Sequence, residues 1–170
     1  MGERFVLGVG QCANCSCDAF LWADGLASVT TFGEDNAASA WCHENGGHGA
    51  PDWFPGAFHN LTVARRLADA LGSDWTVVLQ GTGGNCAAIV VTHVPTNGEH
   101  LLTDGDAGLP FDSDGLLSFG LLLCAYDAIG EPLWDEDLAE HVEALMITRG
   151  IGAQPTPEAV ATLAAEAILS

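Results

Sequence analysis

The sequence predicts an α+β protein, in which an antiparallel sheet of about five to eight strands carries about four packed helices. Short apolar and β-branched runs separated by turn residues indicate the sheet, and apolar stripes with helical spacing indicate the helices. A cysteine-rich knuckle near the N-terminus completes the prediction, because three of the six cysteines lie between positions 12 and 17. With 170 residues, 48% of them hydrophobic, the chain can bury a core.

The first part of the chain is predicted to form strands. Arg4–Val9 is the first strand, and a hairpin follows in which Ala19–Trp22 and Leu26–Phe32 flank an Asp-Gly turn.

A short helix and a loop are expected next. Asp35 can cap a helix that runs to about His43 and ends at two glycines. Residues 46–59 are rich in glycine, proline and aromatic residues, which predicts a loop packed over the core or over the cysteine knuckle. An aromatic recognition surface is the alternative interpretation of this loop.

The middle of the chain predicts a helix followed by a meander. Asn60 is expected to cap an amphipathic helix over Leu61–Leu71. Three strand-like runs then follow, joined by short turns typical of antiparallel neighbours: Trp75–Gln80, Cys86–His93 and His100–Thr103.

The last part predicts one more strand and two helices. Leu116–Tyr126 is a long apolar run, expected to be a central strand covered on both faces. A helix is predicted from Asp135 to about Ile147, and Thr156 is expected to cap a final helix that ends near Leu169. We expect one domain over 1–170. A boundary near 72–74 would separate a Cys/His-rich half (1–72) from a β-meander half with two C-terminal helices (73–170).

The cysteine knuckle predicts a zinc site. Cys12 and Cys15 have the spacing at which a tight turn directs two thiolates toward one point. Zinc needs four such ligands in a tetrahedron, and Cys42 with His48 supplies the second pair. The predicted metal ligands are therefore these four residues, with zinc as the cofactor.

Two neighbouring residues are alternative ligands, and a metal-free interpretation also exists. Cys17 can replace one of the cysteines, and His43 can take the place of the predicted histidine. Cysteine is also among the most buried residue types and often behaves as a small hydrophobe. Cys86 and Cys124 lie beside apolar runs and are expected to be core residues of this kind. A metal-free α+β protein with scattered cysteines is thus the competing prediction.

The charge of the chain is strongly negative. There are 23 acidic residues against four arginines and no lysine, a net charge of −19, and the segment 99–143 alone contributes −12. Such a surface repels nucleic acid, whose phosphates need lysine and arginine to neutralise them. It suits a basic protein partner, for which imitation of nucleic-acid charge is one interpretation. Solubility alone also explains the charge. The absence of lysine is typical of a high-GC genome and suggests a phage or mobile-element origin.

No pattern of catalytic or cofactor-binding residues is found. A nucleophile elbow is missing, and the aspartate-rich segments 104–106 and 112–115 lack the later glutamate of a calcium-binding loop. We therefore expect no enzyme. The alternative is a zinc enzyme in which the three predicted cysteine ligands hold the metal and His43, Glu44 or His48 transfers protons.

The location and the function are predicted from these observations together. The N-terminus lacks the features of a signal peptide, and no apolar run approaches the roughly 18 residues of a membrane span. We expect a cytoplasmic protein whose cysteines stay reduced. The sequence thus predicts a small acidic interaction protein with a structural zinc ion and a basic partner.

Overall fold

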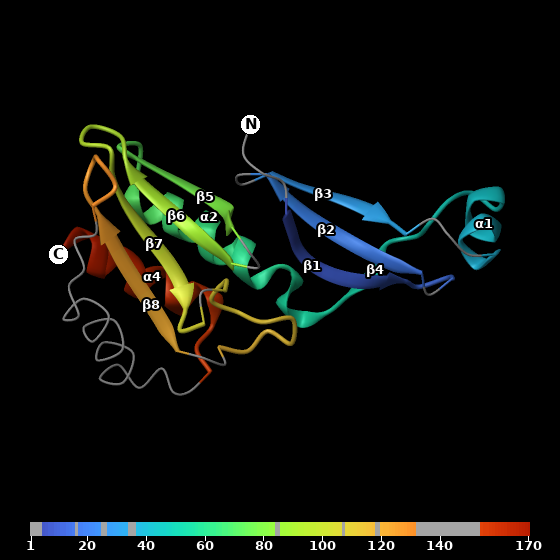
Figure 1. Ribbon diagram of the computed structural model, residues 1–170. Coiled ribbons are helices and arrows are strands. Elements are labelled where there is room, and N and C mark those ends of the chain that lie inside the picture. Colours follow the sequence, from blue (N-terminus) through green and yellow to red (C-terminus); the bar gives the residue numbers. More distant parts are fainter. Residues whose placement is uncertain are drawn as a thin grey trace.

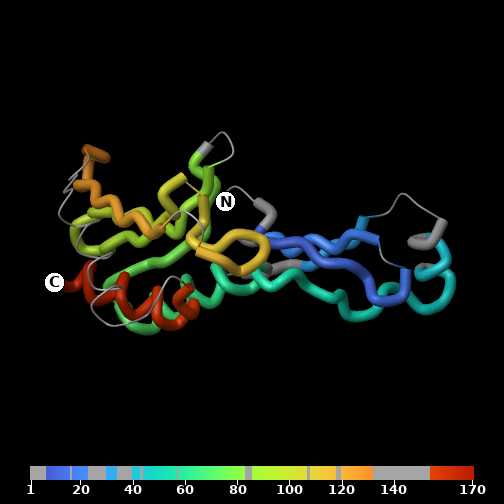
Figure 2. Tube along the Cα trace, turned by 90° about the horizontal axis from the view of Figure 1, so that it is seen from below, coloured from blue at the N-terminus to red at the C-terminus, as the bar shows by residue number. Residues whose placement is uncertain are grey.

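The computed structural model describes residues 5–15, 17–24, 27–33, 37–83, 86–106, 108–117, 120–131 and 154–170. It confirms the α+β class and the antiparallel pairing, but the strands form two four-stranded sheets where we expected one. The two sheets lie end to end, so the molecule is elongated (Figures 1 and 2). No helix in these ranges is long and apolar enough to cross a membrane.

The first sheet has the strand order β3-β2-β1-β4, with every neighbouring pair antiparallel. Its strands are β1 (Phe5–Cys12), β2 (Asp18–Asp24), β3 (Ala27–Phe32) and β4 (Pro51–Trp53). The three expected strands are confirmed, with β1 extended to Cys12. We had predicted that the residues of β4 would lie in a loop. They form a strand because they pair with the edge of β1 that β2 does not occupy. Gly10 permits this close approach, since a Cβ at this position would lie 2.6 Å from the carbonyl oxygen of Asp52.

The second sheet is the predicted meander, in the order β5-β6-β7-β8. Its strands are β5 (Trp75–Gly83), β6 (Cys86–His93), β7 (Gly98–Asp104) and β8 (Leu121–Tyr126). The prediction of a central strand over Leu116–Tyr126 was wrong. The strand begins only at Leu121, after Gly120 with its φ of 77°, and among the described residues β8 pairs with β7 alone.

Helices α2 (His59–Leu71) and α4 (Pro157–Leu169) lie side by side against the second sheet (Figures 1 and 2). Their apolar stripes meet the inner faces of the strands and form the main hydrophobic core. Its fully buried large side chains include Leu61, Leu67, Leu79, Ile89, Leu102, Leu123 and Leu163. Thr156 caps α4 as predicted, because its Oγ1 accepts a hydrogen bond of 3.2 Å from the backbone N–H of Ala159.

Asn60 does not cap α2, which contradicts our prediction. The helix begins at His59, one residue before Asn60, and Asn60 is buried in its first turn. The side chain instead donates to the carbonyl oxygen of Phe111 at 2.8 Å and accepts from the N–H of the same residue at 2.9 Å. These two bonds satisfy buried backbone groups and fasten the loop before β8 to the start of α2.

The described residues contain three α-helices, where we expected about four. The third is α1 (Ala37–Glu44), and a single 3₁₀ turn, η1 (Pro55–Ala57), precedes α2. The helix expected over 135–147, and the expected cap Asp35, lie outside the described residues.

A domain boundary near 72–74 stays a prediction. The packing of α2 against α4 and β5 associates this helix with the second sheet, which favours a division before α2 rather than after it.

Candidate metal centre

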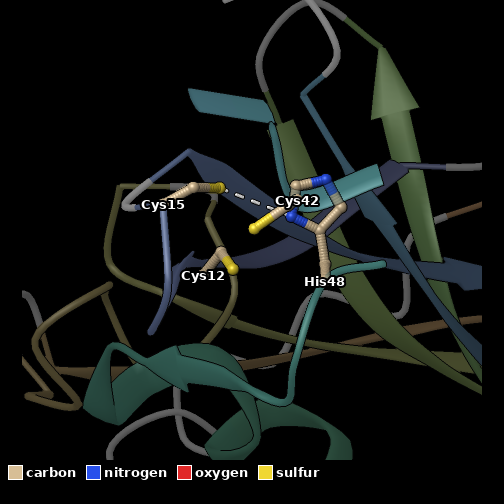
Figure 3. A group of neighbouring side chains, drawn as sticks. All are labelled: Cys12, Cys15, Cys42 and His48. Carbon is tan, nitrogen blue, oxygen red and sulfur yellow. Dashed lines mark hydrogen bonds between the residues drawn. The ribbon is translucent and has the colours of Figure 1, made fainter. Parts of the chain in front are cut away.

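Four side chains converge at the end of the first sheet that is farthest from the second sheet (Figures 1 and 3). Cys12 ends β1, Cys15 lies in the following turn, Cys42 lies in α1, and His48 lies in the segment that leads to β4. One ligand atom from each of the four lies within 4.8 Å of every other. Figure 3 shows the sulfur atoms and the Nδ1 edge of His48 directed toward the same space.

The turn after β1 places the first two donors. Strands β1 and β2 pair as far as Gln11 and Asp18, and the N–H of Cys12 then donates to the carbonyl oxygen of Cys17 at 2.9 Å. This bond closes the tight turn that follows Cys12, so Cys12 and Cys15 stay close together. The spacing of this pair in the sequence was a local signal of that turn.

The other two donors are placed by the end of α1 and by the register of β4. The N–H of Gly47 donates to the carbonyl oxygen of Cys42 at 2.7 Å, and Gly46 and Gly47 have φ values of 101° and 89°. These conformations, which favour glycine, reverse the chain after the helix. Because Pro51 pairs with Cys12, the chain just before β4 brings His48 to the same end of β1.

The spacing of the donors agrees with the size of a tetrahedral zinc ion. Zn–S bonds of about 2.3 Å and Zn–N bonds of about 2.0 Å give a sulfur–nitrogen separation of about 3.5 Å and a sulfur–sulfur separation of about 3.8 Å. The distance from Cys15 Sγ to His48 Nδ1 is 3.5 Å. Three cysteines and one histidine form a donor set that structural zinc sites use, so the cluster is compatible with a metal such as zinc.

Burial and mutual contact shift the protonation of the thiols. Cys12 and Cys42 are each only 1% exposed, whereas Cys15 and His48 are half-buried. A hydrogen bond with His48 is the main cause that lowers the pKa of Cys12 to about 6. Loss of hydration is the main cause that raises the pKa of Cys42 to about 12. In the absence of a cation, a buried group of thiols cannot be fully ionised at neutral pH, and a divalent ion would offset the repulsion among three thiolates.

The residues predicted as alternative ligands or as proton-transfer groups differ in how close they lie to the cluster. Cys17 is buried beside the four, and its Sγ lies 3.5 Å from His48 Nδ1. His43 belongs to α1, but its side chain falls outside the described part of the structure. Glu44, considered as a proton-transfer residue, is exposed at the end of α1.

The two remaining cysteines lie away from the cluster, on the second sheet. Cys124 is half-buried on β8, whereas Cys86 is exposed at the start of β6. The prediction that Cys86 is a core residue was wrong, because the buried part of β6 begins only two residues later.

One contact of the site had no signal in the sequence. The ring of Phe32, at the end of β3, stacks on the His48 ring with centroids 4.3 Å apart and planes 14° apart. This contact fixes the plane of the imidazole while leaving its Nδ1 edge toward the thiols.

Comparisons with protein-family models, with curated proteins and with solved structures found no match for this chain. Evidence about function therefore comes from the residues of the site and their geometry.

Part of the acidic segment has a local structural role. The carboxylates of Asp104, Asp112 and Asp127 each accept hydrogen bonds of 2.7–3.0 Å from backbone N–H groups two and four residues later. Aspartate side chains commonly close turns in this way. Asp104 and Asp112, which lie in the segments without the later glutamate of a calcium-binding loop, thus serve as turn residues.

Proposed function

We propose that this chain is a small binding protein whose N-terminal region is held together by one structural zinc ion. Cys12, Cys15, Cys42 and His48 are the proposed ligands. The observation that carries this proposal is the convergence of four zinc-binding side chains from three separate segments into one cluster. An acidic surface has many causes, whereas three cysteines and one histidine in one cluster form a donor set that structural zinc sites use.

The packing around the cluster supports a structural role for the metal. Among the described side chains, the buried group at this end of the first sheet consists of three cysteines, with only Cys15 and Phe32 packed against it. A helix of eight residues such as α1 is unstable by itself. Burial of one large apolar side chain stabilises by about 1.5–3 kcal/mol, whereas structural zinc binds with about 10–16 kcal/mol in zinc-finger peptides. The metal therefore outweighs the local apolar packing as the force that holds α1.

Four protein ligands also favour a structural over a catalytic ion. A catalytic zinc keeps one coordination position open for water or substrate, whereas a structural zinc has all four positions filled by side chains. The cluster supplies four donors, and two of its cysteines are almost fully shielded from solvent. The zinc-enzyme alternative would require one of these four to be displaced.

A basic protein partner for the acidic surface stays a prediction, as does a phage or mobile-element origin. The net charge of −19 is compatible with such a partner. Three of the twelve acidic residues in the segment 99–143 close turns, so the charge of that segment is not wholly available for docking. If this chain binds cationic proteins and the binding weakens steeply as salt is added, the prediction of a basic partner is supported.

The zinc proposal is tested by elemental analysis of protein purified without a histidine tag or chelator. We expect about one zinc ion per chain in the wild type, and loss of that zinc in Cys12→Ser and in Cys42→Ser. Cys86→Ser is the matched control, because this cysteine is exposed on the second sheet and should leave the zinc content unchanged. A wild-type chain without metal, purified under these conditions and not able to bind added zinc, would refute the proposal.

Cobalt substitution separates the structural role from the catalytic one. A closed site of four side chains should give a tetrahedral cobalt spectrum that does not change when small anions are added. A spectrum that shifts with anions would show an open position and would favour the zinc-enzyme alternative.

A further inference from the structure

A fifth side chain that can bind a metal, Cys17, lies beside the cluster of four proposed ligands. Cys17 lies as close to His48 Nδ1 as Cys15 does, since both Sγ atoms are 3.5 Å from that nitrogen. Cys17 is only 4% exposed and belongs to the same buried group as Cys12 and Cys42. Cys17 is thus a fourth thiol, and a fifth possible donor, beside the four proposed ligands.

Among the four proposed ligands, only His48 lies outside a strand, a tight turn or a helix. Cys12 and Cys15 lie on the tight turn between β1 and β2, and Cys42 lies in a helix. His48 follows Gly46 and Gly47, at which an added Cβ would meet no atom within 4 Å. Glycine adopts positive and negative φ values almost equally well, so the backbone here can change conformation at little steric cost once the hydrogen bond from Gly47 to Cys42 is broken. The segment can therefore move His48 away while the three cysteines stay in place.

We infer that Cys17 is a reserve ligand that replaces His48, so that the centre can hold its metal through three sulfurs and one nitrogen or through four sulfurs. This inference rests on the proposed zinc site. Both sets are complete tetrahedra for zinc. The set with His48 leaves a net charge of −1 on the zinc and its ligands, and the set with Cys17 leaves −2. In a buried site the smaller charge is favoured, which makes His48 the ligand of the resting protein.

Exchange of His48 for Cys17 changes which segments of the chain the metal ion holds in place. Cys42 keeps α1 attached in either state, but only the set with His48 fixes the segment between α1 and β4. Exchange also ends the stacking of His48 on Phe32. The site would thus have two states with the same metal content and different anchoring of residues 46–50.

The inference is tested with three variants of the full chain, titrated with zinc and with cobalt: His48→Ala, Cys17→Ser and the double variant His48→Ala/Cys17→Ser. Both single variants should retain about one zinc, with an affinity within about 100-fold of the wild type, because a complete ligand set remains. The double variant should lose more than about 100-fold in zinc affinity, because only three ligand side chains are left.

The cobalt spectra identify the ligand that enters. The thiolate-to-cobalt charge-transfer absorption should increase in His48→Ala, from the intensity of three thiolates to that of four. In Cys17→Ser the wild-type spectrum should be unchanged.

Two results would overturn the inference. In one, His48→Ala loses zinc as completely as Cys42→Ser. In the other, the double variant binds zinc as tightly as His48→Ala, which would mean that water and not Cys17 fills the position. A wild-type protein that binds no zinc would refute the proposed function itself, so the two failures are distinguishable.

Discussion

At the far end of the first sheet the buried side chains are cysteines, whereas between the second sheet and its helices they are mainly leucine, isoleucine, valine and alanine. The near end of the first sheet shares in that apolar core through Leu7 and Leu21. If the proposed zinc ion is bound, the chain has two means of stabilisation. The second region is stabilised by apolar area removed from water, whereas the end of the first region near α1 would be stabilised by metal coordination. This difference predicts that the two regions respond to different perturbations.

Loss of the metal should have the largest effect. Cys42→Ser, or a strong chelator, should release the zinc and with it a binding free energy on the order of 10 kcal/mol. We expect amide hydrogen exchange to increase in α1 and β4, while β6 and β7 keep their protection. Equal loss of protection in both sheets would contradict the division into two differently stabilised regions.

A cavity in the apolar core should give the opposite pattern. Leu67 of α2 is fully buried against the second sheet, and Leu67→Ala should reduce the free energy of unfolding by about 2–5 kcal/mol. Denaturant unfolding followed by tryptophan fluorescence measures this loss. The zinc content should stay that of the wild type, and a loss of zinc would show that the metal centre depends on the apolar core.

Acid should weaken the metal centre through competition between protons and metal. Cys42, whose pKa is raised to about 12 in the metal-free site, must lose its proton to bind zinc. Each proton released makes the affinity fall about tenfold for each unit by which the pH decreases. Below about pH 6 the slope should steepen, because Cys12 then also carries a proton that zinc must displace.

Zinc titrations at several pH values between about 5 and 8 check this dependence. An affinity that does not change with pH would exclude thiolate ligands. Cys86→Ser serves again as the control and should show the same slope as the wild type.

The smallest effect is expected from the cap of α4. Thr156→Ala removes the hydrogen bond to the N–H of Ala159 and should cost about 1 kcal/mol. Thr156→Ser keeps a hydroxyl and should restore most of the stability. Both variants should leave zinc content and cobalt spectra unchanged, because α4 packs on the second sheet.

Local patterns in the sequence predicted the helices and strands better than they predicted which of these pack or pair together. The Asp-Gly turn between β2 and β3, the apolar stripe of α2 and the cap of α4 each depend on residues close in sequence. The two separate sheets and the strand β4 were missed, because they depend on which strand edge is available in the folded chain. Asn60 has the residue type of a helix cap, but a partner 51 residues away determines its role.

The same distinction between local and long-range signals applies to the residues of the candidate site. The turn that holds Cys12 and Cys15 is local and was predicted from spacing. Cys42 and His48 were chosen only because zinc needs four donors, and the structure brings them to the same point. That these four bind a metal stays a prediction. The position of Cys17 against His48 depends on the register of β4 with β1, which has no local signal.

That register also has a consequence for the order of assembly. The β1–β2 turn, with two of the four donors, can form as soon as the first 24 residues are available, and β3 adds by a short hairpin. His48 reaches the cluster only when Pro51–Trp53 pairs with the other edge of β1. During synthesis, a metal ion captured early by the first turn would remain incompletely coordinated until the chain through residue 53 had emerged. Completion of its coordination would then mark the moment when this end of the protein has closed.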